Sequence, residues 1–292
     1  MRGVLALDIG GTKIAGGLVD AEGRLVRQAV RATGGDPLAS LRAVVAELEV
    51  DGVDGVGIGC AGPIDAVAGT VSPINIGAWR EFPLVARVRE LVGAPVVIAG
   101  DAVCVALGEH WVGAGQGASA MLGMVVSTGV GGGFVVDGRP FGGLTGNAGH
   151  VGHVVVEPDG QPCTCGGRGC VETVASGPNL VRWARRHGWV GEDARDLAAS
   201  AHAGDAVARE AFRRSGWAVG LAIVATAAVC DLDLAVVGGG VAQTGDLLFG
   251  AVRDTLAVHA RLSYLRGLRV EPAKLGTTAG LYGAAALAYS LT

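Results

Sequence analysis

Short apolar runs separated by glycine-rich turns open the chain and predict β-strands. The runs Gly3 to Ile9 and Ile14 to Val19 are separated by so few residues that they can only form a hairpin. A third strand, Arg24 to Arg31, continues the meander. Further strands are predicted over residues 53–60, 95–99, 121–126, 134–136, 234–237 and 268–271.

Helical segments alternate with these strands. Asp36-Pro37 is typical of a helix start, because Asp is a good N-cap and Pro suits the first helical position. Helices are predicted over residues 36–50, 82–92, 102–112, 179–187, 194–203, 205–230 and 277–291, with another after Gly240. The chain is therefore expected to be an α/β protein.

A glycine-rich hairpin with hydroxyl side chains occurs twice. The first is Asp8-Ile9-Gly10-Gly11-Thr12-Lys13 and the second is Ser127-Thr128-Gly129-Val130-Gly131-Gly132-Gly133. Backbone N–H groups in such turns suit phosphate oxygens, and Asp8 can hold Mg2+ through water; the alternative is an ordinary tight turn. The recurrence suggests two similar lobes that clamp a polyphosphate, with a boundary near residues 113–119.

Three other segments have both a structural and a functional interpretation. Asp101 follows a predicted strand and opens a helix, so it is either an N-cap or a carboxylate that accepts a hydroxyl proton. Gly238-Gly239-Gly240 is either a plain connection or a close approach to a base or ribose. Asn75 and Trp79, both expected to be exposed, could contact a sugar, although Asn is common in turns.

The most distinctive stretch is one histidine followed by three cysteines. His153, Cys163, Cys165 and Cys170 give the pattern H-x9-C-x-C-x4-C, with Glu172 two residues later. One imidazole and three thiolates form the ligand set of a structural Zn2+; free thiols or a disulfide are the alternatives. A metal would fix the loop that carries His150, His153 and Glu172.

Composition restricts the class of protein. The chain has 292 residues, of which 50% are hydrophobic and 17% charged, and its net charge of −4 argues against nonspecific nucleic-acid binding. No apolar run is long enough for a membrane span, and no signal peptide is recognised. Cys60, Cys104 and Cys230 are interpreted as buried thiols, so a reducing cytoplasm is expected.

Together the two turns, Gly152-His153 and the cysteine motif with Glu172 resemble the ROK family, within the actin-like ATPase superfamily of sugar kinases. The resemblance covers the whole chain. It implies a two-lobed actin-like (ribonuclease H-like) α/β fold, with an interlobe cleft and a structural zinc loop. The small lobe would comprise residues 1–116 completed by helix 277–292, and the large lobe residues 117–276.

The resemblance further implies ATP-dependent phosphorylation of a hexose 6-hydroxyl, with Mg2+ and structural Zn2+. Asp101 matches the catalytic base. The ATP- and phosphate-binding residues would be Asp8, Gly10, Gly11, Thr12, Lys13, Ser127, Thr128, Gly129, Gly131, Gly238, Gly239 and Gly240. The sugar-binding residues would be Gly62, Asn75, Asp101, His150, His153 and Glu172, and the metal ligands His153, Cys163, Cys165 and Cys170. Homodimers or homotetramers are expected.

Two departures from the family pattern concern the sugar. Gly100 replaces the Asn that usually precedes the catalytic aspartate, and His150 replaces a glutamate. Loss of a partner for a buried hydroxyl costs on the order of 1 to 3 kcal/mol. A modified hexose is therefore expected, such as N-acetylmannosamine or a 3-amino sugar of the kanosamine type, with a glucokinase as the alternative.

The sequence also allows two noncatalytic interpretations, a sugar-sensing regulator and a zinc-stabilised ATP-binding interaction protein. The first turn begins close to Met1, so no DNA-binding domain is expected before it, and this argues against a regulator.

Overall fold

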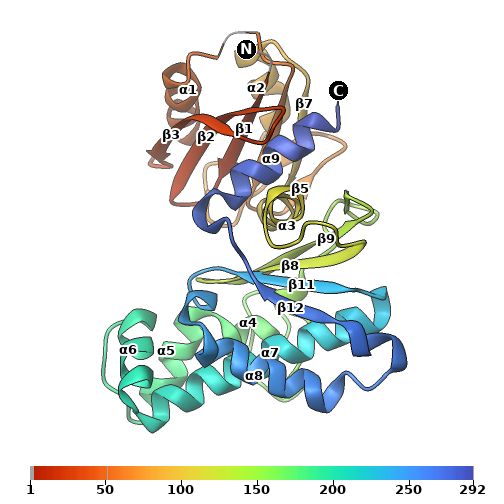
Figure 1. The fold of residues 1–292 in the computed structure, drawn as a ribbon. Coiled ribbons are helices and arrows are strands. Elements are labelled where there is room, and N and C mark those ends of the chain that lie inside the picture. Colours follow the sequence, from red (N-terminus) through yellow and green to blue (C-terminus); the bar gives the residue numbers. More distant parts are fainter. Residues whose placement is uncertain (1–2, 51, 292) are drawn as a thin grey trace. The chain divides into compact units, whose positions relative to one another are not determined.

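The computed structural model describes residues 3–50 and 52–291. The chain divides into two compact units (Figure 1). The first unit comprises Met1–Ala118, Gly133–Gly149 and Lys274–Thr292, and the second comprises Ser119–Gly132 and His150–Ala273. The chain therefore passes between the units several times, and the C-terminal segment belongs with the N-terminal one.

A five-stranded sheet with the order β3-β2-β1-β4-β7 forms the centre of the first unit. Its strands are β1 (Gly3–Ile9), β2 (Lys13–Asp20), β3 (Leu25–Ala32), β4 (Gly55–Cys60) and β7 (Val96–Gly100). The hairpin predicted between β1 and β2 is confirmed, with Ile9 opposite Ile14. β1, β4 and β7 are parallel, and their register aligns Ile9, Cys60 and Gly100. The carboxyl ends of these three strands therefore meet at one edge of the sheet.

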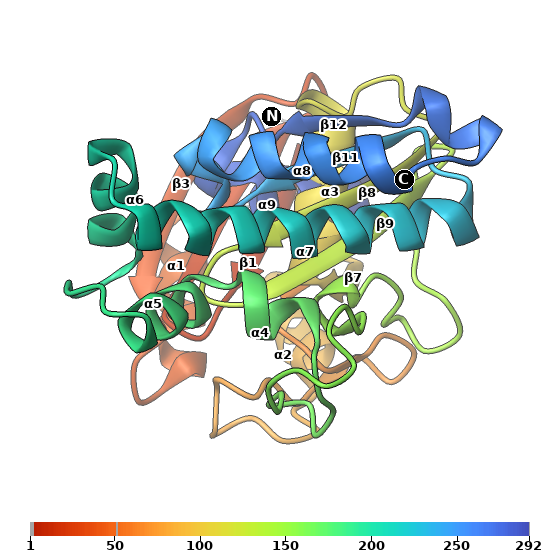
Figure 2. The same cartoon turned by 90° about the horizontal axis from the view of Figure 1, so that it is seen from below.

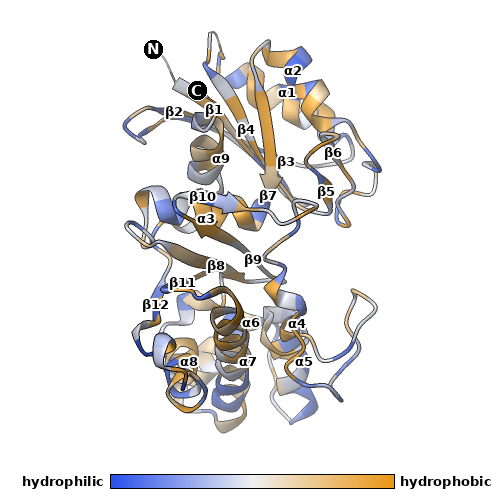
Figure 3. Cartoon of the chain, turned by 90° about the vertical axis from the view of Figure 1, so that its right-hand side faces the viewer, coloured by the Kyte–Doolittle hydropathy of each residue, from blue (hydrophilic) through white to orange (hydrophobic). Residues whose placement is uncertain are grey.

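Helices cover both faces of this sheet. They are α1 (Pro37–Glu47), α2 (Leu84–Val92), α3 (Asp101–Val112) and α9 (Ala279–Tyr289). In β2 a side chain at Gly16 would meet Val44 of α1, whereas one at Gly17 would approach Leu281 of α9. Because successive residues of a strand face opposite sides, α1 and α9 lie on opposite faces. Hydrophobic residues are concentrated along the strands (Figure 3).

α3 and α9 pack against each other with their backbones in close contact. A side chain at Gly283 of α9 would collide with the carbonyl oxygen of Cys104, and one at Gly108 of α3 would collide with that of Ala279. Glu109, only 1% exposed, accepts hydrogen bonds from the backbone N–H groups of Lys274 (3.1 Å) and Leu275 (2.8 Å). The same carboxylate accepts one from Ala114 at 2.8 Å. The C-terminal segment is thus fixed to α3.

The second sheet has the order β10-β9-β8-β11-β12. Its strands are β8 (Ala120–Val126), β9 (Val130–Val136), β10 (Arg139–Phe141), β11 (Leu234–Gly238) and β12 (Arg269–Pro272). The helices of the second unit are α4 (Val171–Ala175), α5 (Gly177–Arg186), α6 (Ala194–Ala203), α7 (Ala206–Cys230) and α8 (Asp246–His259). α7 and α8 run side by side (Figure 2), with Gly216 of α7 against Leu248 of α8.

Short elements complete the fold. β5 (Ile64–Asp65) and β6 (Thr70–Val71) form a small hairpin, and 3-10 turns occur at Val151–His153, Ala242–Thr244, Ser263–Gly267 and Gly276–Thr278. No helix within the described part of the chain has the length and apolar character that a membrane span requires.

Several sequence predictions need correction. α1 ends at Glu47, not near residue 50, and α2 begins at Leu84 because Phe82 forms a bridge with Val71. Trp79 is not exposed: it is 2% accessible and stacks on Phe82, with ring centroids 4.5 Å apart. Cys230, expected to be buried, is exposed at the end of α7.

Candidate active site

The first predicted phosphate turn connects β1 to β2 at the sheet edge. The N–H of Gly10 donates to the carbonyl of Lys13 (3.0 Å), which closes the turn. Thr33, 2% exposed after β3, donates its hydroxyl to the carbonyl of Gly10 (2.7 Å) and its N–H to that of Thr12 (3.0 Å). The sequence analysis missed Thr33, whose only signal is a hydroxyl residue directly after a strand.

Asn75 lies against this turn. A Cβ at Gly11 would be 2.5 Å from the Asn75 side-chain carbon Cγ, so only glycine allows this approach. The structure therefore brings a residue expected to bind sugar next to one expected to bind phosphate. Gly62 lies beyond β4 in the same unit, ahead of β5.

Asp8 and Asp101 are electrostatically coupled at the carboxyl edge of the first sheet. The pKa of Asp8 is raised to about 6, first by burial and then by the charge of Asp101, while Lys13 opposes the increase. Cys60 senses the same charges: its pKa is raised by burial first, then by Asp101 and Asp8. Two carboxylates this close disfavour joint ionisation, which a divalent cation would relieve.

Asp101 is the first residue of α3, not its N-cap. The N-cap position is Gly100, in an extended conformation, and the Asp101 carboxylate accepts a hydrogen bond from the N–H of Ala102 at 2.7 Å. The expected structural role as N-cap is therefore wrong. A carboxylate at this position lies where open α/β sheets bind their ligands.

His153, Cys163, Cys165 and Cys170 form a compact cluster in the second unit. Their ligand atoms all lie within 4.8 Å of one another. Cys163 Sγ lies 3.7 Å from His153 Nδ1, and Cys165 Sγ lies 3.8 Å from Cys170 Sγ. Tetrahedral ligands about 2.3 Å from a zinc ion would be about 3.8 Å apart, so these residues fit Zn2+.

The thiols of this cluster have different ionisation tendencies. Burial, together with the neighbouring Cys163 and Cys165, raises the pKa of Cys170 to about 12. The pKa of Cys165 is lowered, mainly because the N–H of Gly167 donates to its sulfur. Zn2+ binds thiolates and would deprotonate all three. Because Nδ1 of His153 faces Cys163, Nε2 is the nitrogen that remains for a ligand.

Glu172 joins the cysteine loop to the second phosphate turn. It lies on α4, and its Oε2 accepts a hydrogen bond from the N–H of Val130 at 2.9 Å. The turn itself is shorter than expected: the N–H of Ser127 donates to the carbonyl of Gly129 (2.9 Å), and β9 begins at Val130. Thr128 is within the turn, whereas Gly131 belongs to the strand.

Gly238, Gly239 and Gly240 lie beside this turn at the end of β11. Gly239 has a φ of +93°, and a side chain there would collide with the carbonyl of Val126, so glycine is required. Gly240 approaches Ser127, its Cβ position being 3.7 Å from Oγ. His150 is exposed ahead of the Val151–His153 turn, and its ring is 6.3 Å from that of His153.

The predicted site residues thus form one group in each unit. The first unit assembles Asp8, Gly10, Gly11, Thr12, Lys13, Asn75 and Asp101 around the sheet edge and the first turn. The second assembles the metal cluster, Glu172, the second turn and Gly238–Gly240.

Comparisons with known proteins identify the family. The ROK family model matches residues 4–290. A glucokinase from Thermotoga maritima is 33% identical over 97% of this chain and 96% of its own length, and an N-acetylmannosamine kinase from Citrobacter koseri is 35% identical over 97% and 98%.

A solved structure agrees with these relatives. The ROK family glucokinase from Streptomyces griseus, in complex with glucose and AMPPNP, has a TM-score of 0.84 and 36% identity, covering 98% of this chain and 99% of that one. The family model and the near full-length relatives lead to one conclusion: this chain belongs to the ROK family.

Proposed function

We propose that this protein is a sugar kinase that transfers the γ-phosphoryl group of ATP to the 6-hydroxyl of a hexose. The kinase activity follows from ROK family membership and from relatives named glucokinase and N-acetylmannosamine kinase. The observation that carries the proposal is the coupling of Asp101 with Asp8 beside the Gly10–Lys13 turn. A base, a cation-binding carboxylate and a phosphate-binding turn are what phosphoryl transfer needs at one place.

Asp101 is the general base in this proposal. Its carboxylate takes the proton of the 6-hydroxyl as that oxygen forms a bond to the γ-phosphorus, and the bond from phosphorus to the ADP oxygen breaks. Mg2+ bound with ATP would neutralise phosphate charge, and Asp8 would hold it through water. The hydrogen bond from Ala102 N–H fixes the Asp101 carboxylate in the folded chain.

The turns at residues 10–13 and 127–129 bind phosphate oxygens, and Gly238–Gly240 approaches the nucleoside. Gly239 supports this role because it has a positive φ and no side chain, so the backbone there can approach both Val126 and a ligand closely. Sugar hydroxyls are bound by Gly62, Asn75, His150, His153 and Glu172. His153 Nδ1, which faces Cys163, would ligate a bound zinc ion, and this would orient the imidazole ring for the sugar.

We further propose a modified hexose as the preferred substrate, N-acetylmannosamine or a kanosamine-type amino sugar. Gly100 supplies no amide for the hydroxyl that the usual Asn would bind, and a Cβ there would contact only Val103 at 3.7 Å, so space remains. His150 offers an imidazole in place of a carboxylate. Each change should weaken the binding of glucose relative to that of a sugar with a different group at C2 or C3.

A sugar panel tests both levels of the proposal. Steady-state kcat/KM is measured with ATP and Mg2+ on glucose, N-acetylmannosamine, N-acetylglucosamine and kanosamine, and the product is identified by mass spectrometry. Phosphorylation of a panel sugar at the 6-position supports the kinase. A large preference for glucose would reject the modified hexose while leaving the kinase in place.

A further inference from the structure

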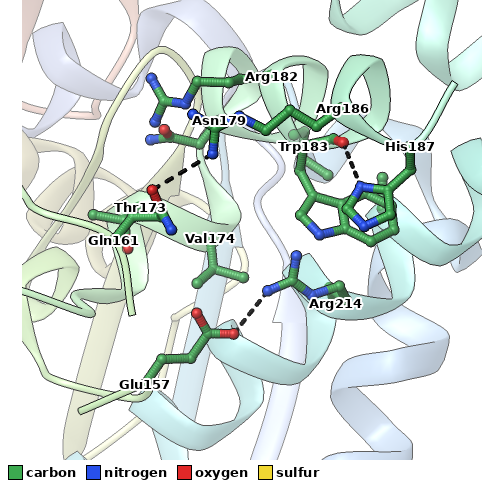
Figure 4. A pocket seen from close by; sticks show the side chains of 12 residues that line it. Glu157, Gln161, Thr173, Val174, Asn179, Arg182, Trp183, Arg186, His187 and Arg214 are labelled. Carbon is green, nitrogen blue, oxygen red and sulfur yellow. Dashed lines mark hydrogen bonds and ion pairs between the residues drawn. The ribbon is translucent and has the colours of Figure 1, made fainter. Parts of the chain in front are cut away.

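A pocket lies in the second unit, outside the residues proposed to bind sugar, ATP and metal. Its volume is about 240 Å³. It is formed by α4, α5 and α7 together with Glu157 and Gln161 of the segment that leads to the cysteines (Figure 4). Ligand pockets for drug-sized molecules start at about 300 Å³, so this one suits a smaller compound.

One face of α5 supplies most of the polar wall. Asn179, Arg182, Trp183, Arg186 and His187 line the pocket, and they follow the spacing i, i+3, i+4, i+7, i+8 of a single helical face. Their side chains surround the same space in Figure 4. This wall combines two cations with a large aromatic ring.

The charge of the pocket is positive although the chain carries a net charge of −4. Three arginines, Arg182, Arg186 and Arg214, face one carboxylate, Glu157. Arg214 is neutralised by Glu157 at 2.7 Å. Within residues 3–50 and 52–291, no ion pair joins Arg182 or Arg186 to a carboxylate. Arg186 makes one long hydrogen bond, from a guanidinium nitrogen to Gln161 Oε1 at 3.5 Å, which leaves its charge unneutralised. Arg182 and Arg186 therefore supply positive charge for an anion.

The helix dipole does not account for both arginines. Basic residues in the last turn of a helix stabilise its C-terminus, which explains Arg185 and contributes at Arg186. Arg185 is also occupied by the carbonyls of Gly191 and Glu192. Arg182 lies a turn earlier, where the dipole has little effect, and it faces the pocket.

The aromatic part of the pocket is held rigidly. His187 stacks on Trp183 with ring centroids 3.9 Å apart, and its Nδ1 is hydrogen-bonded to the Trp183 carbonyl at 2.8 Å. Arg214 lies 4.9 Å from the Trp183 ring. Together with Val174 and Leu180, these rings give the carbon skeleton of a ligand an apolar surface.

We propose that this pocket binds a small phosphorylated metabolite, such as a sugar or polyol phosphate. Arg182 and Arg186 bind the phosphate, since guanidinium groups match its oxygens in a bidentate manner, and the Trp183 wall contacts the carbon skeleton. The site is distinct from the proposed substrate site. Asn179 connects the pocket to the proposed substrate site, because its Nδ2 donates a hydrogen bond to the carbonyl of Glu172 at 2.7 Å.

Calorimetric titration of the full-length protein tests this proposal, with inorganic phosphate and glycerol 3-phosphate as separate probes. We expect the double variant R182A/R186A to bind both probes about tenfold more weakly than wild type, because two charge-assisted contacts are lost. R266A, an exposed arginine of the same unit, is the matched control and should bind as wild type.

Two further measurements keep the outcome clear. Thermal unfolding checks that the double variant folds, and R182Q replaces it if it does not. Tighter binding of glycerol 3-phosphate than of inorganic phosphate, abolished in W183L, assigns the carbon skeleton to the Trp183 wall; equal binding assigns a site for phosphate alone. Unchanged affinity in R182A/R186A overturns the proposal. The proposal is also overturned if R182A/R186A differs from wild type in oligomer size by light scattering but not in phosphate affinity. That result would assign this surface of α5 to contact with a second copy of the chain.

Discussion

The Glu172 carboxylate accepts a hydrogen bond from the N–H of Val130 at 2.9 Å. The residue that follows the cysteine motif therefore also fixes the second predicted phosphate turn, at residues 127–129. A Cβ at Gly129 would lie 2.8 Å from the same carboxylate. The cysteine loop and the turn are therefore connected within the second unit. A perturbation of Glu172 should affect nucleotide and sugar together.

Replacement of Glu172 by Ala tests this connection. We expect kcat/KM for the sugar to fall about 10- to 100-fold, because a charged hydrogen-bond partner is worth about 1.5 to 3 kcal/mol, and KM for ATP to rise as well. Glu172→Gln keeps an oxygen that can accept from Val130 and should restore KM for ATP. Equal ATP KM values in wild type and Glu172→Ala would contradict the connection.

Replacement of Asp101 by Asn tests the general base. We expect kcat to fall about 10²- to 10⁴-fold, since a positioned proton acceptor contributes that much. The Asn oxygen can still accept from Ala102, so thermal stability, sugar affinity and metal content should stay close to wild type. Equilibrium sugar binding and single-turnover kinetics measure the two parts separately; a protein without a catalytic role for Asp101 would show unchanged turnover.

Asp8 should make the protein less stable at neutral pH than at acid pH. Its pKa is raised from 3.8 to about 6, so the folded chain retains the proton between these values while the unfolded chain loses it. This contribution to the free energy of unfolding falls as pH rises through that window, by up to about 3 kcal/mol. Asp8→Asn should therefore be more stable than wild type at pH 8 and similar near pH 3.5.

Urea unfolding without divalent cations measures this difference. Added Mg2+ should reduce it, because the cation favours the ionised Asp8. Asp8→Asn should also lose phosphoryl transfer. If Asp8→Asn were less stable than wild type at pH 8, burial of the ionised Asp8 would not lower the free energy of unfolding.

Gly100→Asn tests the basis of sugar preference. Gly100 has φ −61° and ψ 148°, which any residue can adopt, and its Cβ would contact only Val103 at 3.7 Å, so Asn fits without strain. We expect kcat/KM for glucose to rise about tenfold, as one hydrogen bond to a hydroxyl is restored. Gly100→Ala adds volume without an amide and is the control; combination with His150→Glu should add to the gain.

Metal analysis tests the cysteine cluster. We expect about one zinc per chain by mass spectrometry, and we expect Cys165→Ser to lose it and to unfold at a lower temperature, because structural zinc contributes folding energy. Cys230→Ser removes another exposed thiol that lies outside the cluster and should keep both zinc and stability. Full stability of zinc-free protein would contradict a structural role.

The strands and helices were predictable where one pattern dominated. The hairpin over Gly3–Val19 and α6 at Ala194–Ala203 followed from short apolar runs and helical spacing, and α/β character followed from their alternation. Errors arose where tertiary contacts decided. Phe82 continues a helical pattern but pairs with Val71, and Trp79 reads as a polar-loop residue but is buried by Phe82.

The candidate site could also be predicted in part, where a local sequence pattern specified it. The cysteine cluster follows from spacing alone, since ligands within eighteen residues have few other ways to arrange themselves. The place of Asp101 after a strand allowed either an N-cap or a base, and its role as base remains a prediction from the family resemblance. Its electrostatic interaction with Asp8 depends on the parallel register of β1, β4 and β7, which no local pattern specifies. The contact of Thr33 with the first turn and the pocket lined by Arg182 and Arg186 likewise depend on segments far apart in the sequence.

The backbone contact between Gly108 of α3 and the C-terminal helix has a consequence for biosynthesis. A ribosome releases Asp101 long before Gly283, so α3 lacks its contact with α9 until translation is nearly finished. Premature termination just before Lys274 would therefore leave α3 without this contact and the first unit incomplete. The first unit is complete only after both ends of the chain have been synthesised.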